Sequence, residues 1–172
     1  MKILSKQKNS RMCMICGLDN EYGVNAPFYN MEDGSVMTVF GYKEQHQSYP
    51  GRVHGGMITA MLDEMGLRSL WAKELSEETF GVTISLDTKY RKPVPYETEL
   101  IGRGVVVKNT SHFIITDSYI MDKDGEILAN GRIKYIKMDT QKIQEGIEVH
   151  EEMPYLVEDG RTEIEGPFFD NL

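Results

Sequence analysis

The sequence predicts an α+β fold in which one long helix packs against one face of an antiparallel sheet. The helix is expected over residues 56–75, and four strand-like segments with short turns follow it. Successive strands joined by short turns favour an antiparallel meander over alternating strand–helix units. A Gly-x-Gly-x-x-Gly motif is missing from the sequence, which excludes a dinucleotide-binding fold.

The strands are expected where β-branched and aromatic residues dominate. The first such run covers residues 34–42, and a loop containing Pro and Gly over residues 43–53 separates it from the helix. Pro93 and Pro95 mark the turn after the next strand, and Gly125 supplies a positive φ for a later turn. The four later strands are expected over residues 80–90, 97–108, 111–121 and 126–138.

Composition restricts the class of protein and its partners. Hydrophobic residues make up 40% of the chain and charged residues 27%, as in globular domains. The apolar runs are far shorter than the ~18 residues of a membrane helix, and the start lacks the apolar run of a secretory signal. We therefore expect a cytoplasmic protein without a membrane partner. The net charge of −8 argues against nucleic acid as a partner.

The charge is unevenly divided and suggests three parts. Residues 1–138 hold 17 acidic and 17 basic residues, whereas residues 139–172 hold 10 acidic against 2 basic ones. We expect an N-terminal segment over residues 1–30, the main domain over residues 31–138 and an acidic extension over residues 139–172. One hypothesis for the extension is that Phe168 and Phe169 dock on the main domain or on a neighbouring molecule.

Cys13 and Cys16 form a Cys-x-x-Cys motif with three interpretations. A zinc site of four ligands lacks a second pair of cysteines. A thioredoxin-like motif belongs at a strand-to-helix junction, whereas here Gly17 and Gly23 indicate turns. A reduced pair with a structural role is favoured, and no metal or cofactor is predicted.

The helix is apolar on nearly all sides. At 100° per residue, one face should lie on the sheet and includes Ile58, Met61, Leu62, Met65 and Ala72. The opposite face is also apolar and includes Ala60, Leu67, Leu70 and Trp71. A helix with this pattern is buried on both sides, and the simplest second partner is another copy of the chain. We therefore predict a homodimer or a dimer of dimers.

Asp63 interrupts the second face. Its neighbours one turn away are uncharged, so no local ion pair explains a carboxylate there. Burial of an unpaired carboxylate is costly unless it has a function, and desolvation would raise its pKa and make it a better base. We predict a catalytic role for Asp63, with an interface hydrogen bond as the alternative. Glu64 has Arg68 four residues later and is expected to form a salt bridge.

His54, Gly55 and Gly56 lie where the helix begins. Two glycines let the backbone approach a ligand closely. The unpaired N–H groups of a first helical turn lie at the positive end of the helix dipole and suit an oxyanion. A plain loop-to-helix junction with His54 as the cap is the alternative. A regular helix would separate His54 from Asp63 by ~13.5 Å, too far for both to contact one carbonyl group.

These residues resemble a known family. VHGGMITAMLDEMG, residues 53–66, is similar to the helix of hot-dog-fold acyl-CoA thioesterases of the phenylacetic-acid-degradation type. CMICGLDNEYGVNAPFY (residues 13–29), KYRKPVPYETEL (residues 89–100) and ANGRIKYIKM (residues 129–138) resemble further parts of the same family. The resemblance implies a hot-dog fold, an antiparallel curved sheet wrapped around one central helix.

The resemblance also implies a mechanism. Asp63 would be the general base or nucleophile that hydrolyses an acyl-CoA, and backbone N–H groups at Gly55 and Gly56 would form the oxyanion hole. Thr83 corresponds to a hydroxyl residue that some relatives have on the strand after the helix. The helix start and the carboxylate usually come from different subunits, which would resolve the distance between them. His54 and Glu64 complete the set of candidate catalytic residues.

Substrate-binding candidates follow from the same resemblance. Ser48 occupies a position where many relatives have Asn or Gln, and Gln47 is adjacent to it. Thr59 lies one turn before Asp63. The phosphates of CoA need cations, and the candidates are Arg52, Lys89, Arg91, Lys92, Arg132 and Lys134.

Three alternatives to a thioesterase differ in chemistry. A dehydratase of the same fold would have a His fourteen residues before the carboxylate, but Tyr49 and Pro50 occupy those positions relative to Asp63 and Glu64. A non-catalytic acyl-CoA-binding or assembly protein would explain why Ser48 stands where many relatives have Asn or Gln. A redox or zinc protein would depend on Cys13 and Cys16.

Overall fold

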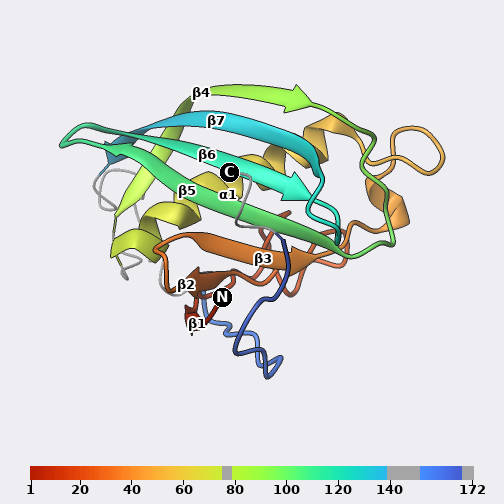
Figure 1. The fold of residues 1–172 in the computed structure, drawn as a ribbon, viewed down its shortest axis with the longest axis horizontal. Coiled ribbons are helices and arrows are strands. Elements are labelled where there is room, and N and C mark those ends of the chain that lie inside the picture. The colour runs from red at the N-terminus through yellow and green to blue at the C-terminus, as the bar shows by residue number, and fades with distance from the viewer. Residues whose placement is uncertain (75–78, 139–151, 168–172) are drawn as a thin grey trace.

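The fold is a strongly curved, seven-stranded antiparallel sheet around one long helix (Figure 1). The computed structural model describes residues 1–74, 79–138 and 152–167. The sheet order is β1-β2-β3-β5-β6-β7-β4. The strands are β1 (Ile3–Lys6), β2 (Tyr29–Met31), β3 (Val36–Phe40), β4 (Phe80–Tyr90), β5 (Leu100–Asn109), β6 (Phe113–Met121) and β7 (Ile127–Met138).

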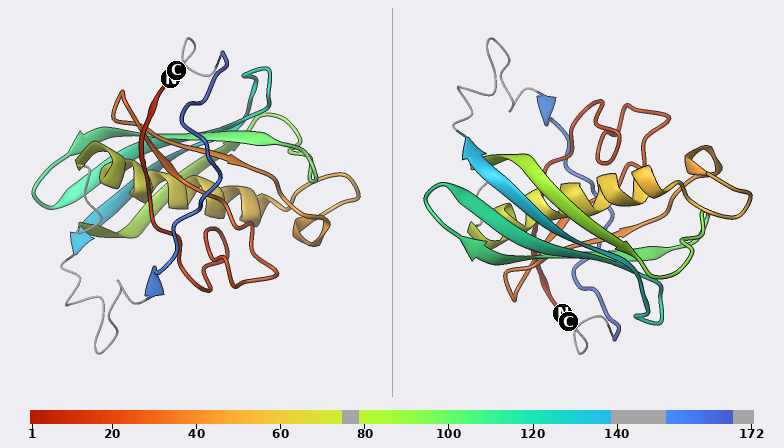
Figure 2. Two further views of the ribbon diagram at one scale, coloured as in Figure 1. Left: turned by 90° about the horizontal axis from the view of Figure 1, so that it is seen from below. Right: turned by 90° about the horizontal axis from the view of Figure 1, so that it is seen from above.

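Helix α1 (Gly55–Glu74) lies along the concave side of the sheet (Figure 2). Its predicted sheet-facing residues Ile58, Met61, Leu62 and Met65 are all buried. The helix approaches β5 closely because Gly104 has no side chain, since a Cβ there would lie 2.5 Å from the carbonyl oxygen of Met65. The predicted single helix on an antiparallel sheet is confirmed.

The element boundaries agree best where the hydrophobic pattern is long. The helix was expected over residues 56–75 and β4 over residues 80–90, and both agree with the structure within one residue. The 3-10 helix η1 (Glu44–His46) was expected to be loop, and the strands β1 and β2 were not expected. These elements span only three or four residues each, too few to show a periodicity.

Part of the second apolar face of α1 is covered by its own chain. Leu70 packs in a cluster with residues of β6 and β7, and Trp71 packs edge-on against Phe80 with 5.3 Å between the ring centroids. The N-terminal segment adds Ile15 and Phe28 to the core around the helix. Ala60 and Leu67, the other two apolar residues of this face, remain partly exposed. The second subunit expected from the two-sided helix therefore stays a prediction.

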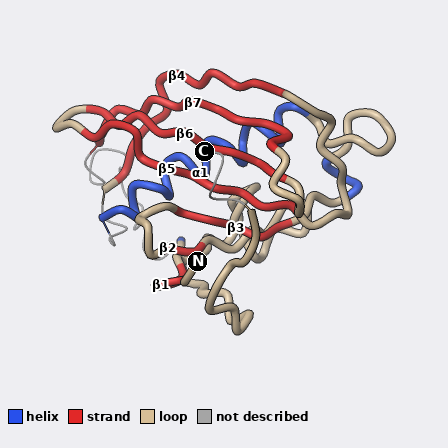
Figure 3. The backbone as a smooth tube through the Cα atoms, in the orientation of Figure 1, coloured by secondary structure: helices blue, strands red, loops and turns tan. Residues whose placement is uncertain are grey.

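The two segments that flank the main domain pack against it and against each other. β1 pairs with β2, and residues 152–167 run beside the N-terminal segment through the bridges Lys2↔Glu163 and Asn9↔Tyr155 (Figure 3). Domain boundaries at residues 30 and 138 stay predictions. Phe168 and Phe169, expected to dock on the domain, lie outside the described residues. Among the described residues, no helix is long and apolar enough to cross a membrane.

Candidate active site

Asp63 lies in the middle of α1 and faces β4. The hydroxyl of Thr83 donates a hydrogen bond of 2.9 Å to Asp63 Oδ1. The hydroxyl of Tyr135, on β7, donates one of 2.7 Å to the backbone carbonyl oxygen of Asp63. The structure thus brings together Asp63 and Thr83, two of the predicted site residues, and adds Tyr135 beside them.

Burial raises the pKa of Asp63 above its ordinary value, as expected from the sequence. The negative charge of Glu64 raises this pKa further, while hydrogen bonds from Thr83 and Tyr135 oppose the shift. No Lys or Arg in the described part of the chain forms an ion pair with this carboxylate. A half-buried, unpaired carboxylate of raised pKa is a stronger base than an ordinary surface carboxylate and is suited to accept a proton.

Tyr135 is a residue that the sequence analysis missed. Its ring is buried, and its hydroxyl occupies the space left by Gly66, where a Cβ would overlap with it. Burial raises the pKa of Tyr135 well above its ordinary value, so its hydroxyl stays protonated and remains a donor. The presence of Gly within a helix that is otherwise rich in good helix formers was the available indication of a close contact.

The first turn of α1 lies at the other end of the candidate site. The Gly56 N–H donates to His54 Nδ1 at 2.9 Å, so His54 acts as a side-chain cap. None of the described residues accepts the Gly55 N–H. The Tyr90 hydroxyl donates to the Gly55 carbonyl oxygen at 3.1 Å and lies 2.6 Å from Thr59 Oγ1. Thr59 therefore belongs to a polar group at the start of the helix.

A pocket of about 370 Å³ opens beside this first turn. Gly55, Ile58 and Tyr90 line it on the side of the helix and β4. Its remaining lining residues come from the loop before the helix and the turn after β4, and they are Ser48, Tyr49, Arg52, Val53, Arg91, Lys92, Pro93 and Val94. Ser48, a substrate-binding candidate, lines the pocket, whereas Gln47 is exposed outside its lining.

The predicted CoA-binding cations line three hollows, and Arg91 lines two of them. Arg91 and Lys92 line the pocket at the first turn together with Arg52. Arg91 also donates to Asn130 Oδ1 at 2.6 Å, and Lys92 is paired with Glu126. Lys89 lines a polar hollow together with Arg91 and Arg132. Arg132 forms two hydrogen bonds with Asp117 at 2.7 and 2.6 Å. Lys134 lines a third hollow, also beside Arg132.

The two halves of the predicted catalytic set do not meet within one chain. Seven residues of helix separate Gly56 from Asp63, which corresponds to ~10.5 Å. Glu64 lies apart from Thr83, because its carboxylate forms the predicted salt bridge with Arg68 at 2.7 Å. The described residues of one molecule therefore contain the carboxylate and the helix start as two separate parts.

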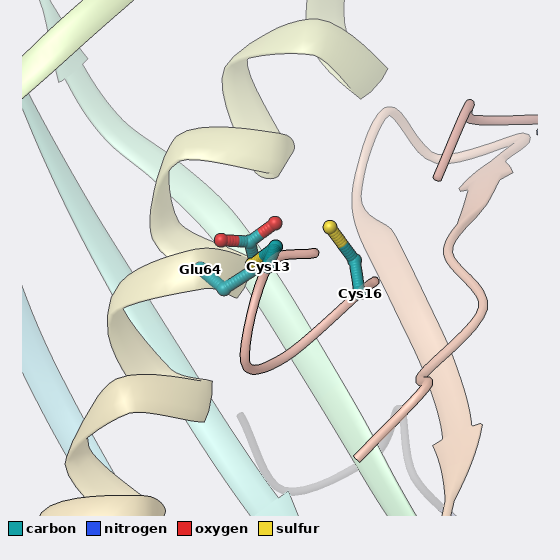
Figure 4. A group of neighbouring side chains, drawn as sticks. All are labelled: Cys13, Cys16 and Glu64. Carbon is teal, nitrogen blue, oxygen red and sulfur yellow. The ribbon is translucent and has the colours of Figure 1, made fainter. Parts of the chain in front are cut away.

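The described residues contain one group of side chains with metal-ligand chemistry. The sulfur atoms of Cys13 and Cys16 and a carboxylate oxygen of Glu64 lie within 4.8 Å of one another (Figure 4). Both cysteines are free thiols. This group packs on α1 beside Arg68, away from Asp63 and Thr83.

Comparison with known proteins agrees with the fold and the motif. The thioesterase superfamily model matches residues 50–129. The acyl-coenzyme A thioesterase THEM4 of Rattus norvegicus is 25% identical over 140 residues, which are 81% of this chain and 57% of that protein. The acyl-coenzyme A thioesterase 13 of Homo sapiens is 23% identical over 100 residues, 58% of this chain and 70% of that protein. The chain thus spans little more than half the length of the THEM4 relative.

Solved structures share the same architecture. A thioesterase superfamily protein has a TM-score of 0.65 and 26% identity over 73% of this chain and 63% of that one. A Ralstonia eutropha protein described as related to phenylacetic acid degradation has a TM-score of 0.58 and 19% identity, over 66% of this chain and 85% of that one. The predicted hot-dog fold is confirmed. Residues 50–129 are thus similar to the thioesterase superfamily, and the chain shares the fold of solved thioesterases.

Proposed function

We propose that the protein hydrolyses an acyl-CoA to a carboxylic acid and CoA, with Asp63 as the catalytic carboxylate. The single observation behind this proposal is the geometry of Asp63, a half-buried carboxylate without a cationic partner that is held by Thr83. Its raised pKa suits a general base, because the proton affinity of the carboxylate is closer to that of the water it must activate.

The hydrolytic step conserves atoms and protons. Asp63 takes a proton from water while the water oxygen bonds to the thioester carbonyl carbon. N–H groups at Gly55 and Gly56 stabilise the oxyanion, the C–S bond then breaks, and the CoA thiolate takes the proton back. If Asp63 is instead the nucleophile, water hydrolyses an acyl-aspartate. If water attacks Cγ of that acyl-aspartate, heavy-oxygen water in a single turnover places the label in Asp63, whereas the general-base route places it in the product acid.

We propose that CoA binds at the pocket beside the first turn of α1. Arg52, Arg91 and Lys92 offer cations there for its phosphates. The relatives named acyl-coenzyme A thioesterase support this substrate class, as does a Bacillus halodurans protein solved with CoA, which has a TM-score of 0.56 and 21% identity over 66% of this chain and 74% of that one.

We further propose that two copies pair along β4, so that Asp63 of one copy meets the helix start of the other. β4 lies at the open edge of the sheet, and its apolar residues Val82 and Ile84 are 41% and 54% exposed. Ile136, the cross-strand neighbour of Val82, is 43% exposed. An exposed, apolar edge strand is a template for pairing with a second chain.

The test of this pairing is a charge on the edge strand. Ile84→Lys should yield monomers by light scattering and abolish hydrolysis. Leu156→Lys, at another exposed apolar residue, should leave the mass unchanged.

A non-catalytic acyl-CoA-binding protein is the second candidate. The Gly56 N–H already donates to His54 Nδ1, which favours this alternative because the donor must be released before it can bind an oxyanion. In the hydrolytic proposal, His54 turns away when the thioester enters.

One experiment separates the two candidates. The native protein is given short, long and aromatic acyl-CoAs, and thiol release and melting temperature are both measured. Hydrolysis of at least one acyl-CoA supports the thioesterase. A raised melting temperature without any thiol release identifies the binding protein instead. Neither effect with any acyl-CoA would contradict both candidates.

A further inference from the structure

The Cys-x-x-Cys motif of the N-terminal segment forms a closed, tightly packed turn. The Gly17 N–H donates to the Cys13 carbonyl oxygen at 2.9 Å and closes the turn. A Cβ on Gly17 would lie 2.5 Å from the Cys13 nitrogen, so only glycine fits there. Asn9 Nδ2 donates a hydrogen bond of 2.7 Å to the Cys16 carbonyl oxygen. The backbone thus keeps the two thiols on one side of a closed turn.

The two thiols differ in a way that suits an attacking and a resolving thiol. Cys13 is half-buried, whereas Cys16 is 2% exposed. The Ile15 N–H donates to Cys13 Sγ at 3.3 Å, and the Cys16 thiol lies within 4.8 Å of the same sulfur. The neighbouring Cys16 thiol and the backbone N–H groups of Ile15 and Cys16 lower the pKa of Cys13 to about 6, while the nearby Cys13 and burial raise the pKa of Cys16. The more accessible sulfur is therefore the one that ionises first.

A buried arginine lies beside this pair. Arg68 is 1% exposed, and its guanidinium donates to Glu64 Oε1 at 2.7 Å and to Gln7 Oε1 at 3.1 Å. The guanidinium also stacks on Phe28, 4.3 Å from the ring centroid. Its positive charge acts on Cys16 and favours a thiolate there. The negative charge of Glu64 acts in the opposite direction on both cysteines.

The same arginine argues against a metal at this site. Three protein ligands are available among the described residues, and Glu64 is already bound by the guanidinium. A divalent cation there would lie against an immobile buried charge of the same sign, and a structural zinc site takes four protein ligands. A pair of thiols that forms a disulfide needs no fourth ligand and places no positive charge beside Arg68.

We propose that Cys13 and Cys16 form a redox-active dithiol that reacts with low-molecular-weight disulfides, Cys13 attacking and Cys16 resolving. The Cys13 thiolate bonds to one sulfur of the disulfide, whose S–S bond breaks and releases the first thiol. Cys16 then gives up its proton, bonds to Cys13 Sγ and releases the second thiol. The chain is oxidised by two electrons, the small disulfide is reduced to two thiols, and the two thiol protons of the chain end on them.

The geometry requires only local movement. The sulfurs lie within 4.8 Å of each other and must approach to about 2.05 Å, which side-chain rotation within a closed turn supplies. Ser10, whose hydroxyl lies 3.3 Å from Cys16 Sγ, is the neighbour that must release this sulfur.

The test uses the full chain in mixtures of reduced and oxidised glutathione. Because the chain has two cysteines, every thiol counted by mass spectrometry after alkylation reports on this pair. We expect both thiols to disappear together, with a loss of two hydrogen atoms and a midpoint that follows the glutathione ratio. Two free thiols in the fully oxidised mixture, or tightly bound zinc that protects both, would overturn the proposal.

Matched variants then assign the roles. Cys16→Ser should accumulate a glutathione adduct on Cys13, because the resolving thiol is missing. Cys13→Ser should react at least tenfold more slowly, because Cys16 is buried. Equal reaction rates of the two variants would refute the assignment. The thiol count on the native chain decides the central point even if a variant fails to fold.

Discussion

At the scale of single residues, burial and the hydrogen bond from Thr83 have opposite effects on the pKa of Asp63. Burial of the Asp63 carboxylate raises its pKa, and the hydrogen bond from Thr83 partly restores the charged form. Tyr135 holds the backbone of the same residue. The proton affinity of the candidate base is therefore set by a small number of named contacts.

The first prediction concerns Thr83→Val. Loss of the hydroxyl removes a hydrogen bond that stabilises the carboxylate, so the pKa of Asp63 should rise further. Since a general base acts when ionised, the acid limb of the pH–rate profile should move to higher pH. Thr83→Ser keeps the donor and should leave the limb in place. An unchanged limb in both variants would mean that Asp63 does not set it.

The second prediction concerns stability. Because the pKa of Asp63 is higher in the folded than in the unfolded protein, the ionised carboxylate lowers the free energy of unfolding at neutral pH. Asp63→Asn should therefore raise the melting temperature at pH 7. The difference should shrink as the pH falls through the folded-state pKa toward ~3.9, the unfolded value. A variant less stable than the native protein at pH 7 would contradict this assignment of the shift.

At the scale of elements, α1 and the sheet meet through residues without side-chain bulk. Gly66 admits the hydroxyl of Tyr135, and Gly104 lets β5 approach the backbone of Met65. The contact at Gly66 connects the core of the fold to the candidate site, because the same hydroxyl reaches the Asp63 carbonyl oxygen.

The third prediction tests this contact. Gly66→Ala would place a Cβ on the Tyr135 hydroxyl and 2.7 Å from Thr116 Oγ1, so it should lower the free energy of unfolding by about 1–3 kcal/mol. Tyr135→Phe removes the hydroxyl and should reduce the cost of Gly66→Ala in the double variant. Chemical denaturation of the four proteins gives the coupling, and strictly additive costs would exclude a direct contact.

The sequence predicted the long elements and singled out Asp63 as a candidate site residue. Helix α1 and strand β4 have long, consistent patterns, and Asp63 is conspicuous because it interrupts an apolar face. Tyr135 escaped prediction because it lies 72 residues from Asp63, and only the sheet register brings it there. The partial cover of the second helix face was missed for a related reason, since sheet curvature and the packing of Ile15 and Phe28 have no local sequence pattern.

At the scale of the whole molecule, the two flanking segments lie side by side and stabilise each other. Residues 152–167 run beside the N-terminal strand, where Lys6 pairs with Asp159 at 2.5 Å. Ile164 completes a buried cluster with Ile3 and Tyr29. The described part of the acidic extension is therefore an integral part of the fold.

The fourth prediction compares two apolar residues of this extension. Ile164 is 2% exposed and Leu156 is 49% exposed. Ile164→Ala should lower the free energy of unfolding by about 2–4 kcal/mol, because it removes buried methyl groups and leaves a cavity. Leu156→Ala should change it by less than about 0.5 kcal/mol, as is usual on a surface. Equal effects in urea denaturation would show that the extension does not pack on the domain.

The most direct test of the proposed function is thiol release by Asp63→Asn with the best acyl-CoA substrate of the native protein. The carboxylate is the proposed base or nucleophile, so we predict that kcat/KM falls by about 10²-fold or more while the melting temperature is kept or raised. Glu64→Gln, one residue further on the salt-bridged side of the helix, is the matched control and should retain most of the activity if it folds. A folded Asp63→Asn variant that hydrolyses the substrate at the native rate would contradict the account.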